Sequence, residues 1–195
     1  MGTFKPSLLA AALAAATFGL SASADDGKQD NFRARLSSYN EVHFIAGPPA
    51  ALRGAISSAA SGSFRAEVDD RRDIIDYVLS YEGLESAVAQ AHIHFGQRHT
   101  VGGIVVWLCQ ATARAPAAVA ALTPECPQEG TVRGTITPQQ VLDVTGQGIA
   151  AGEFEELVRA IRAGATYANV HTATFGPGEI RGQLGGGGRG HDHHD

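Results

Sequence analysis

The sequence predicts an all-β fold, a sandwich or barrel interrupted by one or two short helices. Three observations lead to this prediction. Apolar and polar residues alternate with a period of two along most of the chain, which is the pattern of strands with one buried face. Turn-forming residues separate the alternating segments, and the 24 glycines fit a chain with many tight turns.

Alternation locates the individual strands. In residues 64–69 the apolar Phe64, Ala66 and Val68 alternate with polar residues, and residues 75–80 follow the same pattern. A continuous apolar run over residues 101–108 is expected of a central strand that is buried on both faces. The predicted strands are residues 32–38, 51–58, 62–69, 73–82, 87–95, 103–109, 131–136, 166–173 and 178–184.

Two segments predict helices instead. Residues 137–140 (TPQQ) are a capping box with proline at the first helical position, which begins a short helix. A second helix is predicted from about Glu153 to Ala163, with acidic residues at its start and arginines near its end, an order that complements the helix dipole. Its apolar stripe, which should pack over the end of the sandwich, consists of Phe154, Leu157, Val158 and Ile161.

The N-terminal segment, residues 1–24, has the features of an export signal. Lys5 supplies a small positive charge, residues 8–20 are apolar, and small residues fit a cleavage site after Ala24. A membrane anchor is the alternative, but a spanning helix needs about 20 apolar residues and this run is shorter. We therefore expect a secreted or periplasmic protein.

The rest of the chain is predicted to be one domain over residues 25–184, followed by a disordered glycine- and histidine-rich tail over residues 185–195. The net charge is −5 and the chain has no block of basic residues, which argues against nucleic acid as a partner. No segment after the signal is long and apolar enough to span a membrane.

The two cysteines, Cys109 and Cys126, should form a disulfide in an oxidising compartment. They could instead be metal ligands, but their spacing matches no common zinc module. Residues 110–130, which lie between them, are then a surface excursion that the disulfide holds at its base.

Several motifs together resemble the chordin (CHRD) domain, and the resemblance covers roughly residues 33–184. The opening LSSYNEV of residues 36–42 is similar to the family's first strand, although His43 stands where the family often has proline. The other matching motifs are AHIHFG at 91–96 leading to GIVV at 103–106, GTVRGTIT at 130–137, and YANVHT at 167–172 leading to GEIRGQL at 178–184. The resemblance implies an immunoglobulin-like antiparallel sandwich or barrel and no set of catalytic residues.

Alternation also predicts a candidate metal site. His92 and His94 lie two residues apart and therefore share one face of their strand, while His171 lies opposite two probable core residues of a later strand. If these strands share a sheet, their polar residues form one surface, made of Gln90, His92, His94, Asn169, His171, Glu179, Arg181 and Gln183. Three imidazoles suit copper or zinc. The alternative is a hydrogen-bonded network in which the histidines bind nothing.

Five other histidines are weaker candidates. His99 follows the H-x-H strand and is a candidate fourth ligand, although a solvated loop position is the simpler interpretation. His43 is expected to be a surface position, and the tail carries His191, His193 and His194, which could chelate a divalent ion loosely.

The sequence therefore favours a secreted, non-catalytic binding or structural module with an extracellular or periplasmic ligand. The alternative function is an extracytoplasmic copper- or zinc-binding protein, or a copper redox enzyme, that uses the three-histidine site.

Overall fold

The structure is a computed structural model, and it describes residues 1–2, 30–44 and 53–186. Nearly all of the predicted export signal and the tail beyond Gly186 lie outside the described residues. The strands are β1 (Asp30–Ser37), β2 (His43–Phe44), β3 (Arg53–Gly54), β4 (Ser61–Asp69), β5 (Ile74–Glu82), β6 (Val88–Phe95), β7 (Gly103–Gln110), β8 (Gly130–Ile136), β9 (Thr166–Thr172), β10 (Ile180–Gln183) and β11 (Gly185–Gly186). The helical elements are η1 (Ser38–Asn40), η2 (Ala120–Leu122), η3 (Pro138–Gln140) and α1 (Phe154–Arg162).

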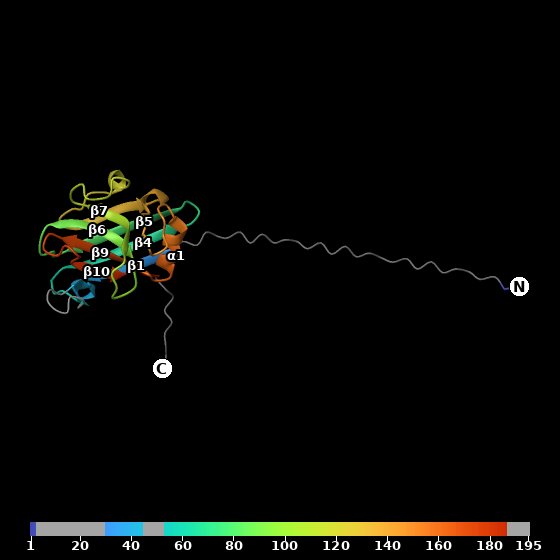
Figure 1. The fold of residues 1–195 in the computed structure, drawn as a ribbon, viewed down its shortest axis with the longest axis horizontal. Helices are drawn as coiled ribbons and strands as arrows, with labels where there is room; N and C mark the ends of the chain where they lie inside the picture. The colour runs from blue at the N-terminus through green and yellow to red at the C-terminus, as the bar shows by residue number, and fades with distance from the viewer. Residues whose placement is uncertain (3–29, 45–52, 187–195) are drawn as a thin grey trace, which may run out of the picture.

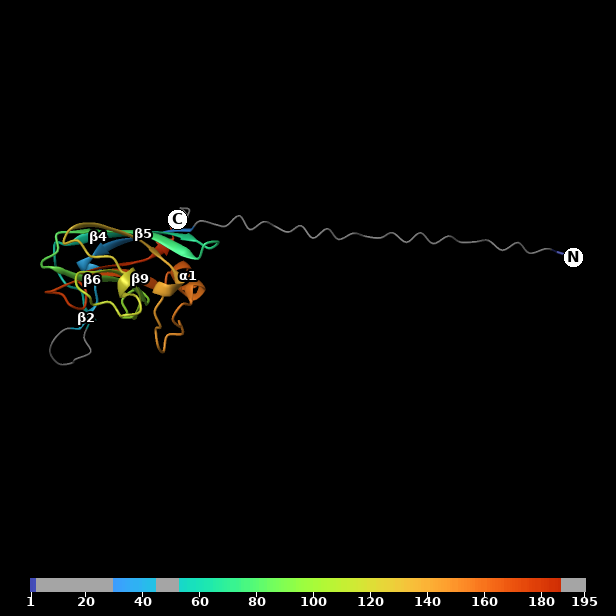
Figure 2. The ribbon, with the colours of Figure 1, turned by 90° about the horizontal axis from the view of Figure 1, so that it is seen from above.

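One antiparallel sheet contains nearly all of these strands, in the order β7-β6-β9-β10-β1-β4-β5-β8. The sheet folds over on itself, so that β4 and β5 lie in one layer and β6 and β9 in the other, with α1 at one end (Figures 1 and 2). Its two end strands, β7 and β8, come within 8 Å of each other at some Cα atoms. The predicted all-β sandwich is therefore confirmed as a nearly closed antiparallel sheet.

The core lies between the two layers and is built by the alternation that the sequence shows. Phe64, Ala66 and Val68 of β4 point inward and are buried, and Ala91 and Ile93 of β6 face them from the other layer. Because every second residue of each strand joins this core, the remaining residues must face outward. The outward faces of the two layers therefore carry most of the polar side chains of the strands.

The seam between the two end strands is held by the disulfide that the cysteine count predicts. Cys109 of β7 is bonded to Cys126, which lies a few residues before β8, with 17 residues of sequence separation. A loop of this length is worth about 3 kcal/mol of stability on the chain-entropy model. Tyr77 of β5 crosses the same seam, since its hydroxyl donates to the Leu108 carbonyl of β7 at 2.6 Å.

Both predicted helices are present. Helix α1 buries its apolar stripe and carries Glu155 and Glu156 in its first turn. At its other end, Arg162 forms ion pairs with Asp30 (2.7 Å) and Asp70 (2.6 Å). The capping box produces only the single turn η3. Among the described residues, no helix has both the length and the apolarity needed to cross a bilayer.

The structure corrects three details. The predicted strand 51–58 is a strand only at β3, because its sole partner is the two-residue strand β2, and residues 51–52 lie outside the described residues. The predicted tail begins two residues too early, since Gly185 and Gly186 pair with β1. The excursion over residues 110–130 does not simply project into solvent, because its Ala115 and Val119 pack against Trp107 of β7.

Candidate functional site

The outward face of β6, β9 and β10 carries the polar side chains that lie opposite the core. In the pairing of β6 with β9, His92 lies opposite Asn169 and His94 lies opposite Tyr167. His171, two residues after Asn169 on the same face, is then a diagonal neighbour of His92. The structure therefore brings His92, His94 and His171 together on one sheet face, where alternation places them.

This face is buried, which corrects the expectation of an exposed polar surface. The exposed fraction is 0% for His92, 7% for His94 and 6% for His171, and it is 2% for both Asn169 and Arg181. Period-two alternation separates the two faces of a strand, but it does not show whether connecting segments cover the outer face. Here they do.

The cover comes from segments that are distant in sequence. Trp107 of β7 packs edge-on against His92, with ring centroids 4.3 Å apart. The connection between β6 and β7, residues 96–102, is anchored by Arg181, which donates to two of its carbonyls at 2.7 and 3.0 Å. On another side, His43 contacts the Gly178 carbonyl through Nε2 at 2.6 Å.

Hydrogen bonds to backbone carbonyls fix the proton positions on two histidines. His94 Nδ1 lies 2.9 Å from the Gly102 carbonyl oxygen, and His171 Nδ1 lies 2.8 Å from that of Gly176. A carbonyl oxygen only accepts, so both Nδ1 atoms carry a hydrogen. Burial lowers the pKa of His94 and of His171 to about 4, and both rings are therefore neutral at pH 7. Each consequently presents a bare lone pair at Nε2.

His92 completes the same pattern. Its Nδ1 lies 3.1 Å from His171 Nε2, which has no hydrogen to give, so His92 Nδ1 is the donor. Burial, and then the neighbouring His171, lower the pKa of His92 well below its usual value, so this ring is also neutral. Its Nε2 is left as an acceptor, and within the described part of the chain neither this atom nor His94 Nε2 has a hydrogen-bond partner.

Asn169 adds a third acceptor at the same place. Its Oδ1 lies 3.0 Å from His171 Nε2, so that two lone pairs face each other with no hydrogen between them. Such a contact is favourable when a cation lies beside both atoms. In the alternative hydrogen-bonded network, the Asn169 amide must turn so that its Nδ2 donates to the imidazole.

The spacing of the three rings is close to that of a metal site. One ring nitrogen from each histidine lies within 4.8 Å of the others, slightly wider than the roughly 4 Å that sequence reasoning predicts for ligands of one ion. In a tetrahedral zinc or copper site the ligand nitrogens are about 3.4 Å apart, since each lies about 2.0–2.1 Å from the metal. To bind one ion, the three rings must move closer together, and His171 Nε2 must exchange its hydrogen bond from His92 Nδ1 for the metal.

Aromatic and charged groups hold the rings in place. Tyr167 stacks on His94 with ring centroids 4.7 Å apart, and the Arg181 guanidinium lies 3.3 Å from the centre of the Tyr167 ring. Glu41 is buried nearby, and burial raises its pKa although Arg181 opposes the shift. Such outer contacts orient metal-ligating histidines in proteins.

The remaining predicted residues lie elsewhere or play other parts. Glu179, a member of the predicted polar surface, is engaged away from the histidines, since its buried carboxylate accepts from Thr172 Oγ1 at 2.8 Å and from the Glu85 amide at 3.0 Å. His99 is exposed and is not in the cluster. His43 is half-buried against Phe175 and is more than a surface position. The tail histidines lie outside the described residues.

Sequence reasoning missed Glu41 and Trp107. Trp107 lies in an apolar run where alternation cannot assign a face, and the only signal for it was its position on the strand that follows the H-x-H motif. Nothing in the sequence indicated that Glu41, in the turn after β1, folds back against this face.

The fold and this face define a single-disulfide, antiparallel β-sandwich domain with a buried histidine cluster. A family model described as the CHRD domain matches residues 32–184, which include all three histidines and the disulfide. The chain therefore belongs to the CHRD-domain family. A search of curated proteins found no match.

Proposed function

We propose that this CHRD-family protein is a non-catalytic, extracytoplasmic binding module whose ligand is a metal ion held by His92, His94 and His171. The observation that carries the proposal is the pair of buried Nε2 atoms without a hydrogen-bond partner, on His92 and His94. Buried polar atoms are nearly always paired in folded proteins, and leaving one unpaired costs about 1–3 kcal/mol. A shared cation would satisfy both lone pairs.

Copper is the metal that the donor set supports best. The set contains three neutral nitrogens and neither a thiolate nor a carboxylate. Imidazole suits copper and zinc, and at a nitrogen site the general order of affinities places divalent copper above zinc. The low exposure of the three rings leaves little room for a substrate at the metal, which supports a binding role over a redox enzyme.

Trp107 provides a direct test, because it is the only tryptophan of the chain and its ring lies 4.3 Å from that of His92. In full-length protein with the tail histidines changed to alanine, Cu²⁺ should quench the tryptophan fluorescence at micromolar or lower concentration. Zn²⁺ should compete without quenching to the same extent. Equilibrium dialysis with metal analysis should give one ion per chain.

Variants of the cluster decide between the metal site and the hydrogen-bonded network. His94→Asn and His171→Asn should each weaken copper binding at least tenfold, since the asparagine Nδ2 can replace the imidazole Nδ1 as donor to the same carbonyl but offers no imidazole. The matched control is His99→Asn, which changes an exposed histidine outside the cluster. Weak binding that is the same in all three variants would leave the network as the correct interpretation.

Export is part of the same proposal. The Cys109–Cys126 disulfide supports an oxidising compartment, and the N-terminal pattern supports removal of residues 1–24. The exported protein should then begin at Asp25, which N-terminal sequencing of the protein from the periplasm or medium would check. An N-terminus that retains residues 8–20 would contradict cleavage.

A further inference from the structure

A row of arginines crosses the outward face of the other layer. The strand register places Arg33 of β1 opposite Arg65 of β4, Arg65 opposite Val78 of β5, and Val78 opposite Arg133 of β8. The side chains of Arg33, Arg65 and Arg133 therefore lie on one line across four strands, and all three are exposed. Arg35 is exposed two residues along β1, on the same face. We refer to Arg33, Arg65 and Arg133 as the arginine row.

This arrangement costs stability. Like charges directly opposite each other on neighbouring strands repel, and Arg33 and Arg65 are such a pair. Within the described residues no ion pair involves a member of the row. The neighbouring line of the face contains Glu67 and Asp76, but Asp76 accepts from Thr135 Oγ1.

Three arginines elsewhere in the described part of the chain have acidic partners. Arg162 pairs with Asp30 and Asp70, Arg159 with Glu156, and Arg72 with Asp69. The chain as a whole is acidic, with a net charge of −5. The arginine row is therefore a local concentration of positive charge, and it does not follow from a basic composition.

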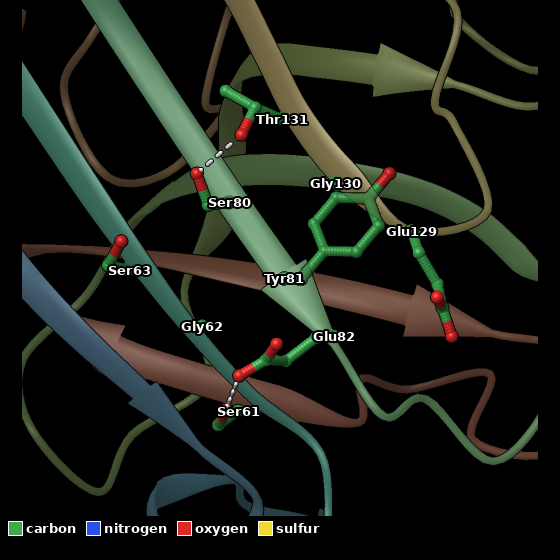
Figure 3. Close-up of a pocket in the computed structure, with 9 residues that line it drawn as sticks. All are labelled: Ser61, Gly62, Ser63, Ser80, Tyr81, Glu82, Glu129, Gly130 and Thr131. Atoms are coloured by element: carbon green, nitrogen blue, oxygen red, sulfur yellow. Dashed lines mark hydrogen bonds between the residues drawn. The ribbon is translucent and has the colours of Figure 1, made fainter.

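The surface around the row is hollowed and rich in hydroxyl groups. The row lines a shallow hollow of about 600 Å³. A second hollow of about 650 Å³ adjoins it on β4, β5 and β8, and Figure 3 shows that Ser63, Ser80 and Thr131 line it together with the carboxylates of Glu82 and Glu129. Ser80 Oγ and Thr131 Oγ1 lie 2.9 Å apart. The two hollows together give an open, polar trough across the strands.

We propose that this trough binds a linear anionic polysaccharide through the arginine row. A guanidinium binds a carboxylate or a sulfate group with two parallel hydrogen bonds, and the exposed arginines of this open trough can make them without obstruction. The row spans three strand spacings, about 14 Å, so that an extended polymer can place several charges on it. The serine and threonine hydroxyls beside the row suit the hydroxyl groups of sugars.

The composition of the face favours a polysaccharide over a nucleic acid. Single-stranded nucleic acids are bound by stacking their bases on aromatic side chains, and the outward-facing positions of β1, β4, β5 and β8 include no aromatic residue. The trough lies on the opposite layer from the histidine cluster, so it is independent of the proposed metal binding.

The test measures binding of the full-length protein to polygalacturonate, which carries carboxylates, and to dextran sulfate, with neutral dextran and oligothymidylate as comparisons. We expect binding to one or both anionic polysaccharides, and which one identifies the anionic group. The double variant Arg65→Gln/Arg133→Gln should bind at least tenfold more weakly, with a salt dependence reduced by about two charges. The matched control Arg72→Gln/Arg159→Gln, which removes the same charge elsewhere, should stay within twofold of the unchanged protein.

Three results would overturn the proposal. They are no binding to either anionic polysaccharide at low salt, an equal loss in the control variant, and tighter binding to oligothymidylate. The double variant should melt at the same temperature as the unchanged protein or higher, because it relieves repulsion. If it melts lower, Arg33→Gln on the neighbouring strand replaces it, and unchanged binding in that variant also overturns the proposal.

Discussion

The metal-free protein should lose most of its stability between pH 6.5 and pH 4. The unfolded chain binds protons on its histidines below about pH 6.5, whereas burial lowers the pKa of His94 and of His171 to about 4 and lowers the pKa of His92 well below its usual value. A pKa that is lower in the folded state gives stability that is present above the unfolded value and is lost as the pH falls. Each histidine then removes up to about 1.4 kcal/mol per pH unit.

Glu41 acts in the opposite direction, because burial raises its pKa and the folded form takes up a proton more readily than the unfolded form. The single Glu41 carboxyl therefore offsets only part of the destabilisation that the three buried histidines cause at low pH. Since a domain of this kind is stable by about 5–15 kcal/mol, we expect an acid-unfolding midpoint between about pH 4 and pH 6.

Urea unfolding in the presence of a chelator, at pH 7 and at pH 5, would measure this effect. His94→Asn should make the pH profile less steep, because the asparagine Nδ2 can keep the hydrogen bond to Gly102 and does not titrate. His99→Asn should leave the profile unchanged. Equal free energies of unfolding at the two pH values would show that the buried rings do not control acid stability.

Arg181→Ala should lower the free energy of unfolding at pH 7 by about 3–5 kcal/mol. Arg181 is 2% exposed, and its removal leaves the carbonyls of Gln97 and Thr100 without their donor. It also uncovers the ring of Tyr167 and leaves the buried Glu41 without its nearby cation. The loss of a partner beside a buried charge is among the most destabilising single changes.

Two further variants separate packing from charge. Arg181→Lys keeps the charge but loses the planar fork that spans the two carbonyls, so its effect should be intermediate. Arg71→Ala removes an exposed arginine from the turn between β4 and β5 and should change stability by less than about 0.5 kcal/mol. If Arg181→Ala were no more destabilising than Arg71→Ala, the cover over the histidines would not depend on Arg181.

The sequence carried the information that assigns side chains to faces. The period of two placed His92 and His94 on one face and Ala91 and Ile93 on the other, and the structure has this division. The apolar stripe and charge order of residues 153–163 likewise identified α1 to within one residue at each end.

The sequence did not show which strands and connecting segments lie next to one another. Alternation gives the outward direction of Arg33, Arg65 and Arg133, but only strand register shows that they form a row. Trp107 covers His92, and residues 96–102, which Arg181 anchors, cover His94. Pairing between distant strands brings these groups together. Residues 55–58 belong to the predicted strand 51–58, yet the structure has no strand there.

The position of β10 between β9 and β1 has a consequence for how the molecule is made. Two groups of strands, β7-β6-β9 and β1-β4-β5-β8, are joined within the sheet only through β10, one of the last strands to be synthesised. Because synthesis starts at the N-terminus, the H-x-H motif is made long before Arg181 of β10, which anchors residues 96–102 over the histidines. The histidine cluster closes only after the whole domain has been delivered. Under the proposed export and metal binding, the ion would therefore be selected in the compartment where folding ends and not where the chain is synthesised.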